Sequence, residues 1–418
     1  MSEIPVTNWA GNVVYEASER VAPTSVEQVQ DAVRAARASG KRLRVVGTRH
    51  CFNAIADTDG VHVTLRDLPR RVEVTNEGSA WVDGGITYAE ANAALAEHGL
   101  ALANLASLPH ITIAGAIATA THGSGVTQPS LASAVRSLTH VTADGDLRIV
   151  RRGDAGFAHY PVHLGLFGPI VELELDVVPA FEIATTVYEG LDYAAAVEHF
   201  DTLVSELYSF SLAPNWQDGG RALLFAKRRG GDAAPAEILG ARAATSARHP
   251  SPGADPVAVT EQLGVAGPSY ERLTHFRSEF EPSVGEEVQS EYLVPREHAG
   301  AALSALPQFA DVFATLAHSM EIRAVAGDDL SLSPMRGADV VAVHITWHRD
   351  PDAVMRFLPR LEAALEPFDA RPHWGKLYAT SRERMLELFP ALPEVDAEAR
   401  GLDPDGMFRN AWSEALFG

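Results

Sequence analysis

The chain of 418 residues contains a single cysteine, Cys51, which excludes a disulfide within the chain and a metal or redox site of the Cys-x-x-Cys type. Basic residues are also few, because 34 Lys and Arg stand against 55 Asp and Glu, for a formal net charge of −21. The acidic residues are spread along the chain without a long run of one sign. Nucleic acids and anionic membranes are therefore poor candidates as partners.

Long apolar segments are absent as well. No window holds about 18 consecutive apolar residues, and the N-terminus lacks the basic and apolar regions of a signal peptide, so we expect a cytoplasmic protein. Four motifs are missing, namely GxGxxG after a strand, GxxxxGK[ST], HExxH and GxSxG. Their absence disfavours Rossmann nicotinamide enzymes, P-loop nucleotidases, zinc peptidases and α/β-hydrolases.

The length and composition of the chain predict a globular protein of two or three domains. Hydrophobic residues make up 46% of the chain and charged residues 21%. A helix that Thr24 or Ser25 caps should end at Gly40 and lead into a strand from Leu43. The pattern also predicts strands at 61–65, 72–75, 80–83 and 168–178, helices at 88–98, 193–207 and 296–309, a hairpin at Asp144-Gly145, and a loop or disordered tip at 230–256.

Two segments of the first half could contact a ligand. The strand from Leu43 breaks at Gly47, and backbone N–H groups in such a turn form a concave nest that favours phosphate. The turn also carries His50, although a lone histidine is more often structural. Residues 104–125 are rich in small side chains and nearly free of charge, so this backbone either packs tightly inside the protein or lies flat against a bulky group.

Two strands of the second half have an unusually polar face. The strand 340–348 has one apolar face, and His344 and Thr346 lie on the other. A second strand presents Glu321 and Arg323 together in the same way. Such faces are often merely solvated in antiparallel sheets, but together they make a layer suited to a small ligand rich in hydroxyl groups.

Two further segments extend this polar layer. Residues 289–292 form a third strand of the same kind, and a Trp-Gly turn carries His373 and Lys376. A buried lysine there could donate hydrogen bonds to a substrate or stabilise a negatively charged reduced cofactor, unless the turn lies at the surface. We expect no metal site, because His344 and His348 on one strand would lie about 13 Å apart.

Six segments, taken in order, resemble the motifs of the vanillyl-alcohol-oxidase family of flavoproteins, in which bacterial alditol oxidases are most similar. They are Gly-Thr-Arg-His50-Cys-Phe-Asn, Leu-Ala-Ser107-Leu-Pro-His, Ile-Ala-Gly115-Ala-Ile-Ala-Thr119-Ala-Thr-His-Gly, Glu321-Ile-Arg323, His344-Ile-Thr346-Trp and His373-Trp-Gly-Lys376. The resemblance extends over almost the whole chain, from Thr7 to Ala411.

This resemblance implies an α+β fold of two domains, with FAD bound in the PCMH-type manner. Residues 1–179 would form the FAD-binding domain, 180–372 a substrate (cap) domain on an antiparallel sheet, and 373–418 a segment that returns to the FAD domain. FAD would be attached covalently through its ring 8α-methyl to His50. The other implied cofactor contacts are Val45, Val46, Gly47, Thr48, Arg49, Cys51, Ser107, Thr112, Gly115, Thr119, Ala120, Thr121, His122, Ile170 and His373.

The resemblance also implies an activity, the oxidation of the terminal primary hydroxyl of alditols such as xylitol and sorbitol, with O₂ reduced to hydrogen peroxide. His344 would be the base, Arg323 and Lys376 would stabilise the incipient alkoxide, and Glu321 would orient Arg323 or accept a distal hydroxyl. The implied polyol-binding residues are Ser107, Glu321, Arg323, Thr346 and Lys376. We expect a monomer whose partners are the polyol and O₂. Two alternatives remain, a sugar-1,4-lactone oxidase or dehydrogenase on the same scaffold and a non-catalytic carbohydrate-binding flavoprotein.

Overall fold

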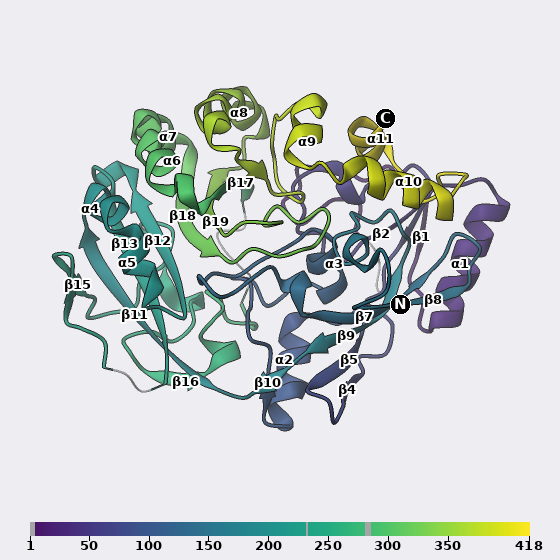
Figure 1. The fold of residues 1–418 in the computed structure, drawn as a ribbon, viewed down its shortest axis with the longest axis horizontal. Coiled ribbons are helices and arrows are strands. Elements are labelled where there is room, and N and C mark those ends of the chain that lie inside the picture. Colours follow the sequence, from purple (N-terminus) through teal and green to yellow (C-terminus); the bar gives the residue numbers. More distant parts are fainter. Residues whose placement is uncertain (1–4, 231–232, 281–285) are drawn as a thin grey trace.

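The computed structural model of the protein describes residues 5–230, 233–280 and 286–418, shown as a ribbon in Figure 1. Helices and strands are intermixed along these ranges, and the described strands form four sheets, most of them antiparallel in their pairing, so the fold is α+β. None of the helices in these ranges combines the length and the hydropathy that a bilayer span requires.

Two main sheets occupy the first part of the chain, on the right of Figure 1. The larger is antiparallel, with the order β4 (Val72–Val74), β5 (Ser79–Asp83), β9 (Ile170–Asp176), β7 (Val135–Val141) and β8 (Leu147–Arg151). The smaller is parallel, with the order β1 (Glu19–Val21), β3 (Val61–Val63) and β2 (Leu43–Val45). A minor sheet pairs β6 (Leu100–Ala101) with β10 (Val178–Pro179).

Several predicted elements of this part are confirmed. The first helix is α1 (Val26–Ala38), and Ser25 caps it by accepting a hydrogen bond from the backbone N–H of Gln28. The predicted hairpin joins β7 to β8, and Gly145 turns it with φ +82°, a conformation that glycine adopts without strain. The remaining helices of this part are α2 (Tyr88–Glu97) and α3 (Ile113–Ala118).

A ten-stranded sheet dominates the rest of the chain. Every pairing in it is antiparallel, in the order β14 (Glu237–Ile238), β15 (Ala241–Ala243), β11 (Glu182–Leu191), β13 (Arg221–Arg229), β12 (Ser209–Asn215), β18 (Ala317–Val325), β19 (Val340–His348), β17 (Glu287–Pro295) and β20 (Arg371–Pro372), with β16 (Ala266–Pro268) also paired to β11. Helices cover one face of this sheet (Figure 1), namely α4 (Tyr193–Glu198), α5 (Phe200–Ser205), α6 (Ala299–Ala305), α7 (Ala310–Leu316) and α8 (Pro351–Leu365).

The alternation predicted for β19 explains how this sheet is oriented. Val343, Ile345 and Trp347 are fully buried and pack in one apolar cluster with side chains of the covering helices. Burying each such side chain contributes about 1.5–3 kcal/mol, so a one-residue slip of the strand would be costly. The opposite face of β19, with His344 and Thr346, consequently turns toward the first part of the chain.

Three predictions for this region need correction. The helix expected at 193–207 is interrupted, because His199 has φ −104° and ψ 17° and separates α4 from α5. In the segment 296–309 only α6 is α-helical, since Pro307 lacks the N–H that would continue the helix and a 3-10 turn follows. The segment 230–256 is not simply a loop, because β15 pairs with β11 and extends the sheet, while 231–232 lie outside the described residues.

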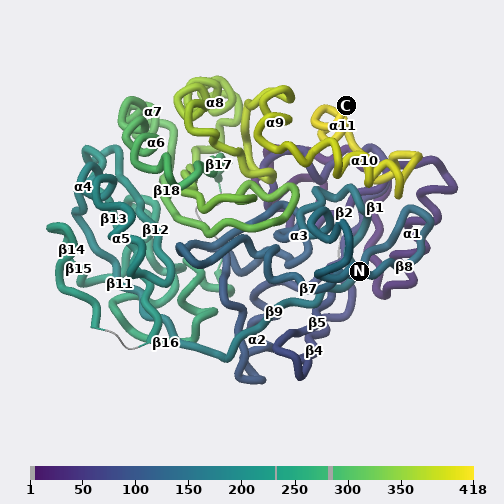
Figure 2. The backbone as a smooth tube through the Cα atoms, in the orientation of Figure 1, coloured from purple at the N-terminus to yellow at the C-terminus, as the bar shows by residue number. Residues whose placement is uncertain are grey.

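The C-terminal segment lies beside the first part of the chain, as the yellow and purple tubes of Figure 2 show. Its helices are α9 (Arg382–Leu388), α10 (Leu392–Leu402) and α11 (Ala411–Phe417), and their apolar side chains share one core cluster with α2, α3 and β9. The backbone N–H of Leu43 donates to Met407 O at 2.8 Å, and Arg42 forms an ion pair of 2.6 Å with Glu414. The two ends of the chain therefore stabilise one another.

Candidate active site

A cavity of about 240 Å³ lies between the turn after β2, the segment around α3 and the polar face of the ten-stranded sheet. All but one of the predicted cofactor and substrate residues line it, namely Val45, Val46, Gly47, Thr48, Arg49, His50, Cys51, Ser107, Thr112, Gly115, Thr119, Thr121, His122, Ile170, Glu321, Arg323, His344, Thr346, His373 and Lys376. The exception is Ala120, whose methyl group is buried in the core cluster of the first part and whose φ is +55°.

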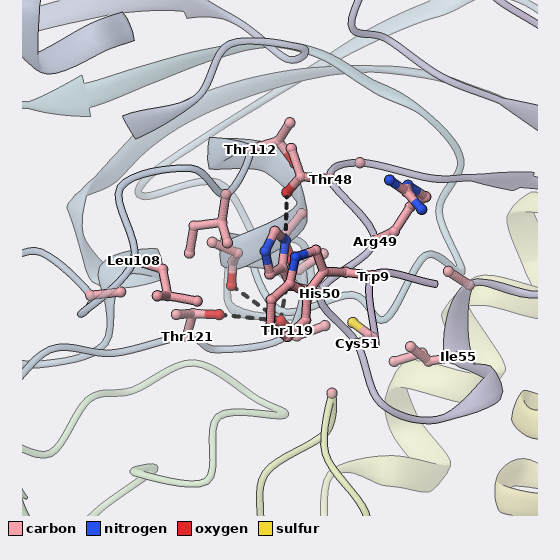
Figure 3. Close-up of a pocket in the computed structure, with 18 of the residues that line it drawn as sticks. Trp9, Thr48, Arg49, His50, Cys51, Ile55, Leu108, Thr112, Thr119 and Thr121 are labelled. Atoms are coloured by element: carbon pink, nitrogen blue, oxygen red, sulfur yellow. Dashed lines mark hydrogen bonds between the residues drawn. The ribbon is translucent and has the colours of Figure 1, made fainter. Parts of the chain in front are cut away.

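The turn at 47–51 presents its backbone to this cavity (Figure 3). None of its backbone N–H groups donates a hydrogen bond to the described part of the chain. Arg49 adopts the left-handed conformation, with φ +66°, and its guanidinium donates to Thr7 O at 2.8 Å instead of entering the turn. Gly47 is required here, because a Cβ atom would lie 2.3 Å from Thr112 Oγ1. The turn thus has the free donors of an anion-binding nest.

His50 is held in this turn by contacts that leave one ring nitrogen free. Its ring stacks on Trp9 at 5.2 Å between centroids, and its Nδ1 lies 3.1 Å from Thr48 Oγ1 (Figure 3). Its Nε2 is buried and has no hydrogen-bond partner among the described residues. Burial, assisted by His110 and Arg49, lowers the pKa of His50 to about 3, so the imidazole is neutral. A neutral ring with an unpartnered nitrogen fits a histidine that is bonded to a cofactor.

The segment of small residues around α3 forms the adjoining wall. Ile113, Ala116 and Ile117 are buried in the core, whereas Gly115 is exposed to the cavity. Thr119 Oγ1 donates to Gly115 O at 3.2 Å, so the backbone of this wall satisfies its hydroxyl. One side of this segment is therefore tightly packed, as the first interpretation predicted, and the other side faces the cavity.

A buried ion pair on β18 faces this wall. Arg323 Nη2 donates to Glu321 Oε2 at 2.8 Å, His275 Nε2 lies 3.1 Å from the same oxygen, and Ser211 Oγ also donates to it. Burial alone would raise the pKa of Glu321, but Arg323 and His275 outweigh it and hold that pKa well below its usual value. Glu321 is thus an ionised carboxylate engaged by Arg323, which favours the orienting role. Arg323 Nε is buried without a partner in the described chain and is free to bind a ligand.

Replacing Ser211 by Ala should lower the free energy of unfolding by about 1.5–3 kcal/mol, because the buried Glu321 carboxylate loses one charge-assisted donor. Urea unfolding of the variant at neutral pH measures this change. Ser209→Ala is the matched control, since Ser209 is a buried serine on the same strand that does not bond to Glu321. Equal losses in the two variants would contradict a specific role for the Ser211 hydroxyl.

A second ion pair, between Glu291 and Lys376, lies close to the pair on β18. Glu291 of β17 lies opposite His344 of β19, which in turn lies opposite Glu321 of β18. Lys376 Nζ lies 2.5 Å from Glu291 Oε2 and 2.6 Å from His344 Nδ1, and His344 Nε2 lies 3.2 Å from Thr346 Oγ1. Burial, and then the charge of Lys376, lowers the pKa of His344 to about 4. The imidazole is consequently neutral and able to accept a proton.

Three residues of this site were not assigned from the sequence. Glu291 could have been found, because it shares a strand face with Gln289 in the predicted polar strand at 289–292. Ser211 and His275 carried no signal, since one lies on an ordinary strand and the other in an irregular segment. Their contact with Glu321 arises only from the fold.

Irregular parts of the second half also line the cavity. Pro250, Ser251 and Phe276 line the cavity, and the backbone N–H of His275 donates to Ser107 O at 3.0 Å. This bond connects the second half directly to a residue that the sequence analysis assigned to substrate. In the described ranges, no group of three or more His, Cys, Asp or Glu side chains is arranged to hold a metal ion.

Comparison with family models finds two matches. Residues 17–151 match the FAD binding domain, and residues 275–416 match D-arabinono-1,4-lactone oxidase. The FAD match contains the turn at 47–51 and the segment around α3. The second match contains Glu291, the ion pair of β18 and the C-terminal helices.

The chain also resembles whole proteins. It is 44% identical to an alditol oxidase from Streptomyces sp. over 98% of each chain. It is 28% identical to an L-gulono-1,4-lactone dehydrogenase from Mycobacterium tuberculosis over 99% of each chain, and 28% identical to the L-gulonolactone oxidase of Bos taurus over 98% of this chain and 97% of that one. A cholesterol oxidase from B. sterolicum has the same fold, with a TM-score of 0.80 at 14% identity over 99% of this chain and 96% of that one.

Proposed function

Because the chain belongs to the alditol oxidase family of FAD-dependent oxidoreductases, we propose that it oxidises the terminal primary hydroxyl of alditols such as xylitol and sorbitol to the aldose, with O₂ reduced to hydrogen peroxide. One observation carries the proposal. The buried ion pairs of Glu321 with Arg323 and of Glu291 with Lys376 line the same cavity as the unpartnered Nε2 of His50. The wall that would bind the cofactor and the polar side chains that would bind a polyol thus line the same cavity.

The residues of the first part fit FAD. The free N–H groups at 47–51 would receive the diphosphate, the small residues around α3 would lie against the ring system, and His50 Nε2 would form the covalent bond to it. Bound FAD supplies a two-electron acceptor that takes the carbinol hydrogen with its electron pair and is reoxidised by O₂. His373, which also lines the cavity, would contact the cofactor from the C-terminal segment.

Side chains of the protein would accept the hydroxyl proton and stabilise the negative charge that develops on the substrate oxygen. His344 accepts the hydroxyl proton at Nε2, and the hydroxyls of Thr346 and Ser107 position the polyol. Arg323, with its free Nε, and Lys376 donate to the oxygen as the proton leaves it. Because this negative charge develops only during the reaction, stabilising it lowers the barrier without tightening the binding of the substrate.

We expect activity to persist into acidic solution. His344 must be neutral to accept the proton, and burial together with Lys376 lowers its pKa to about 4. The ratio kcat/KM should therefore stay level well below the ordinary histidine pKa of about 6.5 and fall only as the pH drops through about 4. Measuring kcat/KM across the acidic range, on enzyme shown to remain folded, checks this limb. An acidic limb centred near 6.5 would contradict His344 as the buried base.

The proposal is tested by offering the purified protein alditols and sugar lactones in parallel. The expected result is peroxide formation with xylitol or sorbitol. The second candidate, oxidation of a sugar-1,4-lactone, is favoured by the match of residues 275–416 to a lactone oxidase and by the lactone-oxidising relatives at 28% identity. An artificial electron acceptor should be included, because a dehydrogenase would reduce it while forming little peroxide. Turnover of lactones but not alditols would replace the first candidate with the second.

We also propose how the chain is divided into domains. Residues 1–179 and 373–418 would form the FAD domain and 180–372 the cap of a cytoplasmic monomer. Support comes from the core cluster that the C-terminal helices share with α2 and α3, and from the separate cluster between the ten-stranded sheet and its helices. Sedimentation at several concentrations would test the monomer, and proteolysis in the native state would test the boundaries.

A further inference from the structure

Glu291 is a buried carboxylate that faces both walls of the cavity. Its side chain is 2% exposed, and the backbone N–H of His373 donates to its carbonyl oxygen at 3.0 Å. One carboxylate oxygen, Oε2, contacts Lys376 Nζ at 2.5 Å, and the other, Oε1, lies 3.3 Å from His122 Nε2. Glu291 is therefore the only described carboxylate that contacts the cofactor wall and the proposed base together.

Charged groups around Glu291 keep its carboxylate ionised, and His122 contacts one of its two oxygens. His122 Nδ1 lies 2.9 Å from Gly123 O, and because a carbonyl oxygen only accepts, Nδ1 carries a proton. The buried atoms His122 Nε2 and Glu291 Oε1 face each other at 3.3 Å. The surrounding charges of Lys376, His122 and His344 outweigh burial and hold the pKa of Glu291 well below its usual value.

The other carboxylate oxygen of Glu291, Oε2, affects which ring nitrogen of His344 carries the proton. As the protein stands, Lys376 donates to His344 Nδ1, so a neutral ring carries its proton on Nε2 and cannot accept another there. If Lys376 turns its Nζ to a polyol hydroxyl, Nδ1 loses this donor. The nearest remaining partner of Nδ1 is Glu291 Oε2 at 3.6 Å, and an acceptor at that position favours the tautomer with the proton on Nδ1.

We propose that Glu291 is a positioning residue for the reaction, one that holds Lys376 while the site is free of polyol and accepts a hydrogen bond from the Nδ1–H of His344 once Lys376 engages the substrate. Nε2 is then the proton acceptor. The substrate O–H bond breaks, the Nε2–H bond forms, and the resulting imidazolium is paired with the Glu291 carboxylate. The carbinol hydrogen leaves with its electron pair as in the proposed function, on which this inference rests.

Kinetics of Glu291→Gln provide the first part of the test. The amide keeps the size of the side chain but loses its charge and presents a donor as readily as an acceptor, so kcat should fall about 10²- to 10³-fold with little change in KM. Glu291→Asp should recover part of this loss because it restores the charge. Glu362→Gln is the matched control, since Glu362 is a partly buried carboxylate bonded to Tyr292 and absent from the cavity wall, and its kcat should stay within threefold of the wild type.

The titration of Lys376 provides a second test, which does not depend on catalytic activity. The whole chain contains three lysines, Lys41, Lys227 and Lys376, so selective isotope labelling resolves each side chain by NMR. Glu291 raises the pKa of Lys376 against the effect of burial, so Glu291→Gln should move the titration of Lys376 to lower pH. Lys41, exposed at the surface, should not move and serves as the internal reference.

The outcomes separate the inference from the function on which it rests. If the wild type oxidises no alditol, the proposed function fails, whereas the lysine titration still tests the contact between Glu291 and Lys376. A Glu291→Gln variant with wild-type kcat, or with a Lys376 titration that is unchanged, would overturn the positioning role. Equal losses of kcat in the Gln and Asp variants would also overturn it, since they would indicate a packing defect alone.

Discussion

Replacing Arg323 by Met should lower kcat/KM for the preferred alditol by about 10³-fold. One donor aimed at a developing oxyanion is worth about 10²- to 10³-fold, and Arg323 combines a free Nε with a positive charge in a site shielded from water. The substitution also leaves Glu321 buried without its main counter-ion, which costs about 3–5 kcal/mol of stability. Arg323→Lys keeps the charge but not the planar fork, so its loss should be intermediate.

Steady-state kinetics with folded, cofactor-loaded variants measure this effect, and thermal unfolding measures the loss of stability beside it. Arg409→Met is the matched control, because Arg409 is also buried and paired with a carboxylate, that of Asp396, but lies outside the cavity wall. It should lose stability while keeping kcat/KM. If Arg323→Met retained kcat/KM within tenfold, the transition-state charge would have to be stabilised by other groups, with Lys376 the first to examine.

Replacing His50 by Ala should abolish the retention of yellow colour in acid-precipitated protein. The prediction follows from the free Nε2 of a neutral, stacked imidazole in the cavity wall. A covalently bound flavin remains in the pellet after precipitation, whereas a flavin held only by contacts is released to the supernatant. The fold should survive, because the core beneath the turn is built by other side chains.

Absorption spectra of pellet and supernatant provide the measurement. His110→Ala is a suitable control, since His110 is close enough to lower the pKa of His50 but is not part of the cavity wall, and its pellet should stay yellow. A yellow pellet from His50→Ala would mean that another residue carries the flavin. Cys51 is the neighbouring candidate, although burial raises the pKa of its thiol to about 11, and Cys51→Ala would decide the point.

Local pattern was enough to predict much of the fold. The strict alternation in 340–348 identified β19 and the face on which His344 and Thr346 lie, because side chains alternate between the faces of any strand. The capping pattern at Ser25 located the start of α1 for the same reason, since the contact is local. The break at His199 was missed because no Pro or Gly marks it, and the pairing of β15 depends on a distant strand.

The residue types of the site could be predicted from the amino-acid sequence. The six motifs identified the family, and the match to an alditol oxidase over 98% of the chain confirms that resemblance. Nearly every residue assigned to the site from the sequence lines the cavity, with Ala120 the exception. Motifs are readable because each occupies a short stretch in which strand alternation or a tight turn sets the direction of the side chains.

How these residues interact with one another depends on the folded chain. The register of β17, β18 and β19 puts Glu291, His344 and Glu321 side by side, and that register depends on the packing of the opposite face against the covering helices. The same packing brings Lys376 to Glu291 and His275 to Glu321 from distant parts of the chain. Ionisation follows from burial and from charges within a few ångströms, and neither exists until the chain has folded.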